Sequence, residues 1–299
     1  MKKGIVFFSL LLGLFILSGN TFCQQIAQKD TGSYVTVKLM DGTSLFGKVI
    51  SESADNIVLM TSTLGKMTIK KSNLKSVKKV SAENIKSGKY WFENPNPNKY
   101  LLGSSAIPLE KKTGYYQNIW LFFNSGTYGF TNWFSLTGGF EIFSIMAGSD
   151  GPYFFFLNPK ASFQVADNLY LGGNILYLNS LRYSSDFSGL ASLNGTVTYG
   201  TSNINATASL GWGFVDGSFA KKPIISFSGM ARFSKRLAFI SENWILPVEV
   251  NNKNIYGIYS YGLRFLGEKT SFDLAFINNK DIADQIVIGI PFVDFVFNF

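Results

Sequence analysis

The sequence of 299 residues contains no histidine and one cysteine, Cys23. Histidine is the most common general acid or base near neutral pH, so its absence removes the Ser-His and Cys-His arrangements of hydrolases. Cys23 ends a segment that we expect to be cleaved. The mature chain then has no thiol, which excludes disulfides, thiolate metal sites and cysteine nucleophiles.

Carboxylates are the remaining candidates for acid–base chemistry. Glu141, Asp273 and Asp294 are placed best for it, but we favour a structural ion-pair role for all three. Without histidine or cysteine only carboxylate calcium sites remain, and Asp281 with Asp284 lacks a recognised spacing. We therefore predict no catalytic residue, no metal and no cofactor.

Long apolar runs are also missing after the first residues. Lys2 and Lys3 precede an apolar run from Ile5 to Leu17, which is too short to span a bilayer as a helix and is typical of a signal peptide. We expect cleavage after residue 23. A lipid anchor on Cys23 is the alternative, but Phe22 stands where a lipoprotein signal needs a small residue.

Charge is unevenly distributed along the rest of the chain. Residues 24–99 contain 12 lysines and 6 acidic residues, whereas residues 100–299 contain 13 basic and 13 acidic residues. The prolines at 95 and 97 predict a stiff, extended linker. We therefore expect a small basic β domain at 24–93, a linker at 94–99 and a second domain at 100–299.

The basic domain has its predicted core at 34–80. Tyr34 to Leu39 is a strand pattern, Asp41-Gly42 a tight turn and Ser44 to Ile50 the returning strand. Further strands are predicted at 56–61, 66–70 and 74–80. Five short strands with an Asp-Gly turn, and with Gly47 in the second strand, resemble the small barrels of the SH3 and Sm type. Relatives of Sm proteins bind RNA, but an exported domain would meet none, so we expect no nucleic acid.

The densest basic cluster of the chain lies in this domain and comprises Lys70, Lys71, Lys75, Lys78 and Lys79. It could bind phospholipid head groups, an acidic periplasmic protein or peptidoglycan carboxylates. The alternative is a solvated strand edge, where lysines prevent edge-to-edge pairing. We favour the edge interpretation because no aromatic residue is interleaved with the lysines.

The second domain divides into about 12 strands of about ten residues, the length that tilted strands need to cross a bilayer. In Ile204 to Phe214 the apolar residues alternate with Asn, Thr, Ser and Gly, whereas Glu242 interrupts the pattern of Leu237 to Leu246. An even strand count requires Tyr100 to Ile107 as the first strand and Glu110 to Gly114 as the first outer loop. Short turns are predicted at 130–132, 165–168, 200–203, 234–236 and 266–269. Longer connections are predicted at 144–152, 179–188, 215–222, 247–254 and 278–285.

The last stretch, Ile286 to Phe299, alternates in the same way. Phe295, Phe297 and Phe299 share one apolar face with Val293. An aromatic residue at the end of such a strand resembles the C-terminal signal of bacterial outer-membrane β-barrels. The resemblance implies an all-β, antiparallel transmembrane barrel in the outer membrane, with both of its ends and the basic domain facing the periplasm. Its partners would be outer-membrane lipid and the barrel assembly machinery.

On this register six charged residues face the barrel lumen. They are Glu141, Lys160, Arg232, Arg264, Asp273 and Asp294. Such charges form ion pairs that brace or plug a barrel, or they line a polar conduit. A barrel of about 12 strands lies between the filled barrels of about eight strands and the porins of about sixteen. The number of strands therefore does not show whether the lumen is filled or open. We see no segment long enough to form a folded plug.

Three functions are compatible with these observations. We favour a structural or accessory barrel that presents the basic domain in the periplasm, because the outer loops are short and the charge is asymmetric. A narrow channel or transporter for small solutes is the alternative. An enzyme is least favoured, since the outer-membrane barrels known as lipases, acyltransferases, deacylases and proteases use histidine.

Overall fold

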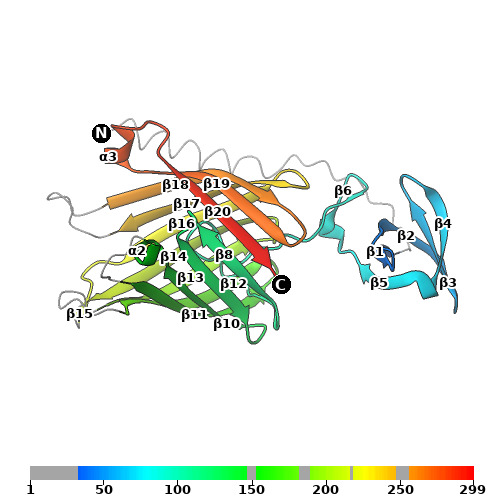
Figure 1. Cartoon of the computed structure of the whole chain (residues 1–299), viewed down its shortest axis with the longest axis horizontal. Coiled ribbons are helices and arrows are strands. Elements are labelled where there is room, and N and C mark those ends of the chain that lie inside the picture. The colour runs from blue at the N-terminus through cyan, green and yellow to red at the C-terminus, as the bar shows by residue number, and fades with distance from the viewer. Residues whose placement is uncertain (1–32, 147–152, 182–188, 216–217, 247–255) are drawn as a thin grey trace. The chain divides into compact units, whose positions relative to one another are not determined.

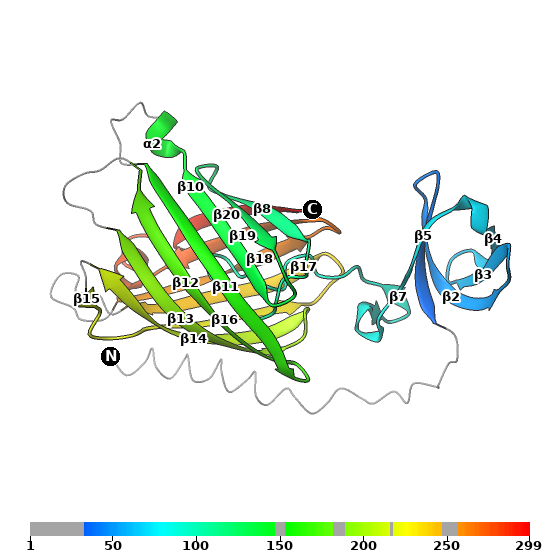
Figure 2. The ribbon, with the colours of Figure 1, turned by 90° about the horizontal axis from the view of Figure 1, so that it is seen from below.

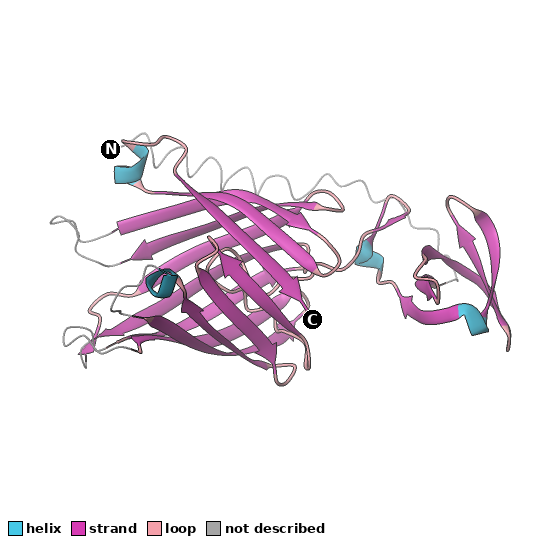
Figure 3. Cartoon of the chain, in the orientation of Figure 1, coloured by secondary structure: helices cyan, strands magenta, loops and turns pink. Residues whose placement is uncertain are grey.

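The structure is a computed structural model that describes residues 33–146, 153–181, 189–215, 218–246 and 256–299. The predicted signal peptide, residues 1–23, lies outside the described residues. The chain divides into two compact units, Met1–Tyr90 and Trp91–Phe299. Both units are built almost entirely from strands (Figure 3). No helix in the described part of the chain has the length and apolar character to cross a membrane.

The N-terminal unit is a five-stranded antiparallel sheet in the order β4-β3-β2-β1-β5. The strands are β1 (Tyr34–Leu39), β2 (Ser44–Glu52), β3 (Asn56–Thr61), β4 (Gly65–Lys70) and β5 (Leu74–Lys79). The 3-10 turns η2 (Lys71–Asn73) and η3 (Ala82–Asn84) and the hairpin of β6 (Ile85–Lys86) and β7 (Lys89–Tyr90) complete the unit. Its core consists of Val35, Val37, Ile57, Leu59 and Ile69. The prediction of five strands is confirmed; the likeness to SH3 and Sm barrels stays a prediction.

Two local features explain the first hairpin. The N–H of Thr43 donates to the Asp41 carboxylate over 2.8 Å, which closes the predicted turn and lowers the pKa of Asp41. Gly47 lies so close to β3 that a Cβ there would be 2.6 Å from the Met60 carbonyl oxygen. Glycine therefore lets the two strands approach each other.

The second unit is a closed antiparallel barrel of twelve strands, in which β20 pairs with β8 and β13 with β14 (Figures 1 and 2). The strands are β8 (Gly114–Ile119), β9 (Phe123–Gly129), β10 (Phe134–Glu141), β11 (Phe154–Ala166), β12 (Leu169–Ser180), β13 (Leu190–Gly200), β14 (Ile204–Val215), β16 (Ile224–Arg232), β17 (Leu237–Leu246), β18 (Tyr256–Leu266), β19 (Thr270–Asn278) and β20 (Ile290–Asn298). The short elements α2 (Phe143–Met146), β15 (Ser218–Phe219) and α3 (Lys280–Ala283) lie in the connections. The predicted fold class and strand number are confirmed.

Connection length alternates around the barrel. Short turns at residues 130–133, 167–168, 201–203, 233–236 and 267–269 lie at the end where β8 begins and β20 ends, which we call the short-turn end. All five lie within a few residues of the predicted turns. The longer connections lie at the opposite end, the loop end, together with one short turn between β8 and β9, and parts of four of the longer connections fall outside the described residues.

The predicted first strand is wrong. Tyr100–Ile107 forms no strand, and the barrel begins at Gly114 with β8, followed by a tight turn to β9. Trp120 and Leu121 in this turn have φ values of 51° and 66°, the left-handed pair of a type I′ turn, which a hydrogen bond of 3.1 Å from the Phe122 N–H to the Ile119 carbonyl closes. One stretch of sequence thus supplies two short strands, and the strand count stays even without Tyr100–Ile107.

The outer face of the barrel is apolar and exposed. Along β14 and β16, residues such as Ile204, Leu210 and Phe227 point outward, while Asn205 and Ser226 point inward and are buried. Exposed outward aromatic residues gather at the short-turn end: Phe130, Trp133, Phe163, Tyr199, Phe233, Phe265, Phe297 and Phe299. A band of apolar side chains with an aromatic girdle is the exterior of a barrel surrounded by lipid, because in water it would be an aggregation surface.

Candidate functional site: a segment bound inside the barrel

Residues 92–107, which we call the inserted segment, lie inside the barrel. Asn96, Ser105 and Ala106 are fully buried, and Tyr100 and Leu101 are each only 1% exposed. The segment doubles back on itself through a bridge between Lys99 and Ser104 and a hydrogen bond from the Tyr100 N–H to the Gly103 carbonyl. The expectation that no segment could plug the lumen is therefore wrong. Residues 94–99, predicted as a linker, are part of this buried segment.

Arg264 of β18 is the central contact of the inserted segment. Its Nη1 donates to the carbonyls of Asn96 and Lys99, both at 3.1 Å, and its Nη2 donates to the carbonyl of Tyr100 at 2.8 Å. The same guanidinium forms a bidentate pair with Asp273 of β19. Arg264 therefore fixes the backbone of the segment to the barrel wall, with its charge compensated across one strand pair.

Lys99 brings a second charge from the segment itself. Its ammonium contacts the Asp294 carboxylate of β20 directly and lies 3.9 Å from that of Asp273. Gln117 of β8 also donates to Asp294, over 3.0 Å. Two cations and two carboxylates thus form one buried network, which satisfies charges that would be very costly to bury alone.

Glu242 of β17 holds the turn of the inserted segment. Its carboxylate accepts the backbone N–H groups of Leu101, Leu102 and Gly103 at 2.8, 3.0 and 2.8 Å, together with the indole N–H of Trp244 at 2.7 Å. Consecutive backbone N–H groups aimed at one carboxylate form an anion-binding nest. The charge of Glu242 is therefore compensated by peptide dipoles of the segment rather than by a cation.

Two further cations bind carbonyls near the ends of the segment. Arg232 donates to the Phe92 carbonyl at 2.8 Å, and its guanidinium lies 4.7 Å from the centre of the Phe92 ring. Lys160 of β11 donates to the carbonyls of Ser105 and Ile107. The start and the end of the inserted segment are thus each attached to the wall.

Neutral side chains fill the spaces between these charges. The Tyr100 hydroxyl lies 2.6 Å from both Asn205 Oδ1 and Thr207 Oγ1. Asn96 donates to Asn298 at 2.9 Å, and the Ala106 N–H donates to Thr198 at 2.7 Å. These partners lie on strands far apart around the barrel, so the segment contacts most of the wall at the short-turn end.

The structure places the six predicted lumen charges in two groups. Lys160, Arg232, Arg264, Asp273 and Asp294 are buried and contact the inserted segment or its network. Glu141 ends β10 at the loop end, where it accepts the N–H of Ser144 at 3.0 Å. It is not part of the network.

Sequence reasoning missed Glu242 and Lys99. Glu242 faces inward with Ala238 and Ile240, which are buried beside it. One acidic residue on an apolar face was the available signal, since such a residue needs a polar partner. Lys99 carried no such signal, because it lay in the predicted linker.

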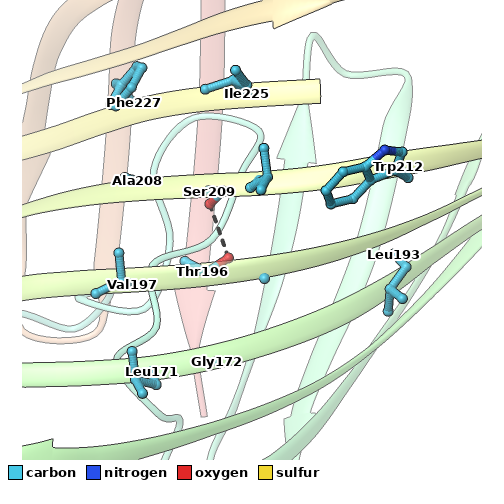
Figure 4. Close-up of a pocket in the computed structure, with 12 residues that line it drawn as sticks. Leu171, Gly172, Leu193, Thr196, Val197, Ala208, Ser209, Trp212, Ile225 and Phe227 are labelled. Carbon is cyan, nitrogen blue, oxygen red and sulfur yellow. Dashed lines mark hydrogen bonds between the residues drawn. The ribbon is translucent and has the colours of Figure 1, made fainter. Parts of the chain in front are cut away.

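Two hollows in the described part of the barrel lie on opposite sides of its wall. One is an internal cavity of about 530 Å³ on the loop-end side of the inserted segment. The other is a groove of about 670 Å³ on the outer face over β12 to β16, where Leu171, Val197, Trp212 and Phe227 surround small residues such as Ala208 (Figure 4). Its walls are those of a surface that lipid chains cover.

The basic cluster lies on and beside the edge strands of the N-terminal sheet. Lys70 ends β4, whereas Lys75, Lys78 and Lys79 are exposed on β5; these are the two edges of the sheet. Lys71 in η2 pairs with Glu52 at 2.8 Å. The lysines thus share the edges rather than one face, which favours the role of protecting exposed strand edges.

The C-terminal residues close the barrel. Phe295, Phe297 and Phe299 are exposed on the outer face, while Asp294 and Val296 are buried inside. Backbone hydrogen bonds of 2.9 and 3.1 Å join Phe299 to Gly114 at the start of the barrel. That this strand acts as an assembly signal stays a prediction.

In the part of the chain that the structure describes, no group of three or more His, Cys, Asp or Glu residues is arranged so that it could hold a metal ion. No protein-family model and no curated protein matches the chain. Solved structures to which the chain is similar include the following two. The NanC porin is 7% identical with a TM-score of 0.40, covering 62% of this chain and 97% of the porin. A loop L8 deletion mutant of OmpT, an outer membrane protein of Vibrio cholerae, is 8% identical with a TM-score of 0.33, covering 90% of this chain and 97% of the mutant.

Proposed function

We propose that this protein is a closed outer-membrane barrel that anchors its basic N-terminal unit in the periplasm. The observation that carries the proposal is the inserted segment. The residues that directly follow the N-terminal unit are bound inside the barrel by Arg232, Arg264, Glu242 and Lys160. The polypeptide that tethers the unit therefore occupies the lumen, as expected of an anchor and not of an open pore.

Chain direction supports the side of the membrane. Phe92 and Asn94 contact Arg232 and Ser202 beside the short turns, so the chain enters the barrel at the short-turn end. Outer-membrane barrels place their short turns in the periplasm. The N-terminal unit is then tethered on the periplasmic side.

Single-channel recordings of the purified protein in planar bilayers test the closed state. The wild-type protein should give no steady conductance. Arg264→Met should produce irregular openings, because it removes three hydrogen bonds to the inserted segment. The matched control is Arg236→Met. Arg236 is exposed in a short turn, and within the described structure its guanidinium makes no hydrogen bond or ion pair to the inserted segment. A stable wild-type conductance would favour the channel interpretation instead.

Protease treatment tests the location of the N-terminal unit. In intact cells the unit should be protected from added trypsin, and after the outer membrane is permeabilised it should be cleaved while the barrel survives. The many exposed lysines of the unit, such as Lys75 and Lys78, provide the cleavage sites. Cleavage in intact cells would place the unit outside and contradict the proposal.

A further inference from the structure

The internal cavity is bounded in part by the inserted segment. Leu102, Gly103 and Ser104 of the inserted segment line it on one side, and Leu102 is 59% exposed to it. Its volume of about 530 Å³ lies within the range of small-molecule sites, about 300–1,000 Å³. The inserted segment thus forms the floor of this internal cavity, which we call the cup.

The walls of the cup change in character along the strands. Next to the floor lie amides and hydroxyls, including Asn158, Asn174, Asn194 and Ser209. One or two inward positions nearer the loop end, the same strands carry Phe156, Leu176 and Leu190. A molecule that fills the cup would meet neutral polar groups at one end and apolar side chains at the other.

Charge is almost absent from the described lining of the cup. Lys99 is its one charged residue, and the Lys99 ammonium is already paired with Asp294. An ionised head group would therefore find no free counter-charge, and burying it would be costly. The amides keep unused capacity for a neutral ligand: Asn174 donates to Asn158 at 2.9 Å, and each amide has two donor hydrogens and a carbonyl with two lone pairs.

We propose that this cup binds an uncharged amphiphile, with its polar head against the asparagines and its apolar chain along the leucines toward the loop end. The ligand class is that of a medium-chain alcohol or monoacylglycerol. Such a site is compatible with a closed lumen, since the ligand enters from the loop end and stops at the inserted segment.

Native mass spectrometry of the full-length mature protein, released from detergent micelles, tests the site. The probes are 1-decanol, decanoate and decylamine, which share a chain length and differ in the charge of the head at neutral pH. We expect the fraction of protein with bound 1-decanol to be at least tenfold larger than the fraction with either charged probe. Equal binding of all three would overturn the proposal, because it would show that the head group is not recognised.

Two variants of the same strand separate the cup from the outer groove. Gly213 of β14 faces the cup, where an added Cβ would meet no atom closer than 3.9 Å, so Gly213→Phe should fill the cup and reduce 1-decanol binding at least tenfold. Ala208→Phe fills the outer groove and should leave binding unchanged. The reverse pattern would assign the binding to the groove and overturn the proposal.

A third variant keeps the test decisive if Gly213→Phe does not fold. Asn174→Leu nearly preserves the volume but removes an amide from the polar belt. It should abolish the preference of the protein for 1-decanol over decane, a probe without a head group. Retention of that preference would mean that the asparagines do not hold the head, contrary to the proposal.

Discussion

Arg264 and Asp273 form a bidentate pair inside the barrel, with both N–O distances at 2.7 Å and both side chains fully buried. The two residues face each other on neighbouring strands, β18 and β19. Through the free edge of its guanidinium, Arg264 also binds three carbonyls of the inserted segment. The Arg264–Asp273 pair therefore joins two neighbouring strands of the wall and also holds the inserted segment in the lumen.

The pair predicts a large and coupled effect on stability. Arg264→Met should lower the free energy of unfolding by about 3–5 kcal/mol, because Asp273 loses its main partner while buried. The double variant Arg264→Met with Asp273→Leu should be less destabilised than the sum of the single variants. Urea unfolding in lipid vesicles, read as a double-mutant cycle, measures the coupling. A coupling energy near zero would contradict the network.

The nest around Glu242 predicts a graded effect. Glu242→Ala leaves the N–H groups of Leu101, Leu102 and Gly103 without their acceptor and should cost about 3 kcal/mol or more. Glu242→Gln keeps one acceptor oxygen and should cost less. Hydrogen exchange at these three amides gives a local readout, with faster exchange in both variants and the larger increase in the alanine variant. Unchanged protection would show that the carboxylate does not hold the turn.

The two faces of β14 and β16 predict opposite tolerance to charge. Ala208 and Gly229 face outward, so arginine at either should destabilise the barrel by about 2–4 kcal/mol near the bilayer midplane. Arginine at Ser209 or Ser228, which line the internal cavity, should cost less, because water that enters the unliganded cavity from the loop end can solvate the guanidinium, whereas lipid cannot. Unfolding midpoints of the four variants in the same vesicles provide the comparison.

Single cysteines at the same four positions give an independent check, because the one cysteine of the sequence, Cys23, lies in the predicted signal peptide. An apolar, membrane-permeant reagent should label 208 and 229. A small charged reagent should reach 209 and 228 only as far as the cavity admits it. Rapid, complete labelling of both serine positions by a bulky impermeant reagent would show that this face is open to bulk water. That result would contradict the assignment of these serines to the inside of the barrel.

The contact between the two ends of the barrel predicts an assembly defect. Deletion of Phe299 removes its two backbone hydrogen bonds to Gly114 and the aromatic residue of the predicted signal. Barrel that shifts on unboiled gels should decrease several-fold, while the N-terminal unit folds as before. Phe299→Tyr, which retains the backbone contacts and the ring, is the matched control. Normal levels of folded barrel after the deletion would remove the basis for the signal.

The sequence by itself determined most strands of the barrel and their facing. Side chains alternate with a period of two, so the pattern of Ile204 to Phe214 showed which of its residues point outward. The same alternation in the later strands placed Arg264, Asp273 and Asp294 inside the barrel. Turn positions followed from local composition in the same way. These features depend on residues that are close in sequence, and they can therefore be predicted without the tertiary structure.

Only the tertiary structure decided what fills the lumen. Tyr100–Ile107 is apolar enough to pass for a strand, and its true partners lie far along the chain, such as Glu242, which is 139 positions from Gly103. Local pattern carries no information about such contacts. Closure of the barrel places Arg264, Glu242 and Lys160 inside the lumen, where buried charged groups need hydrogen-bond partners. The backbone of the inserted segment supplies these partners, so the segment fills the lumen.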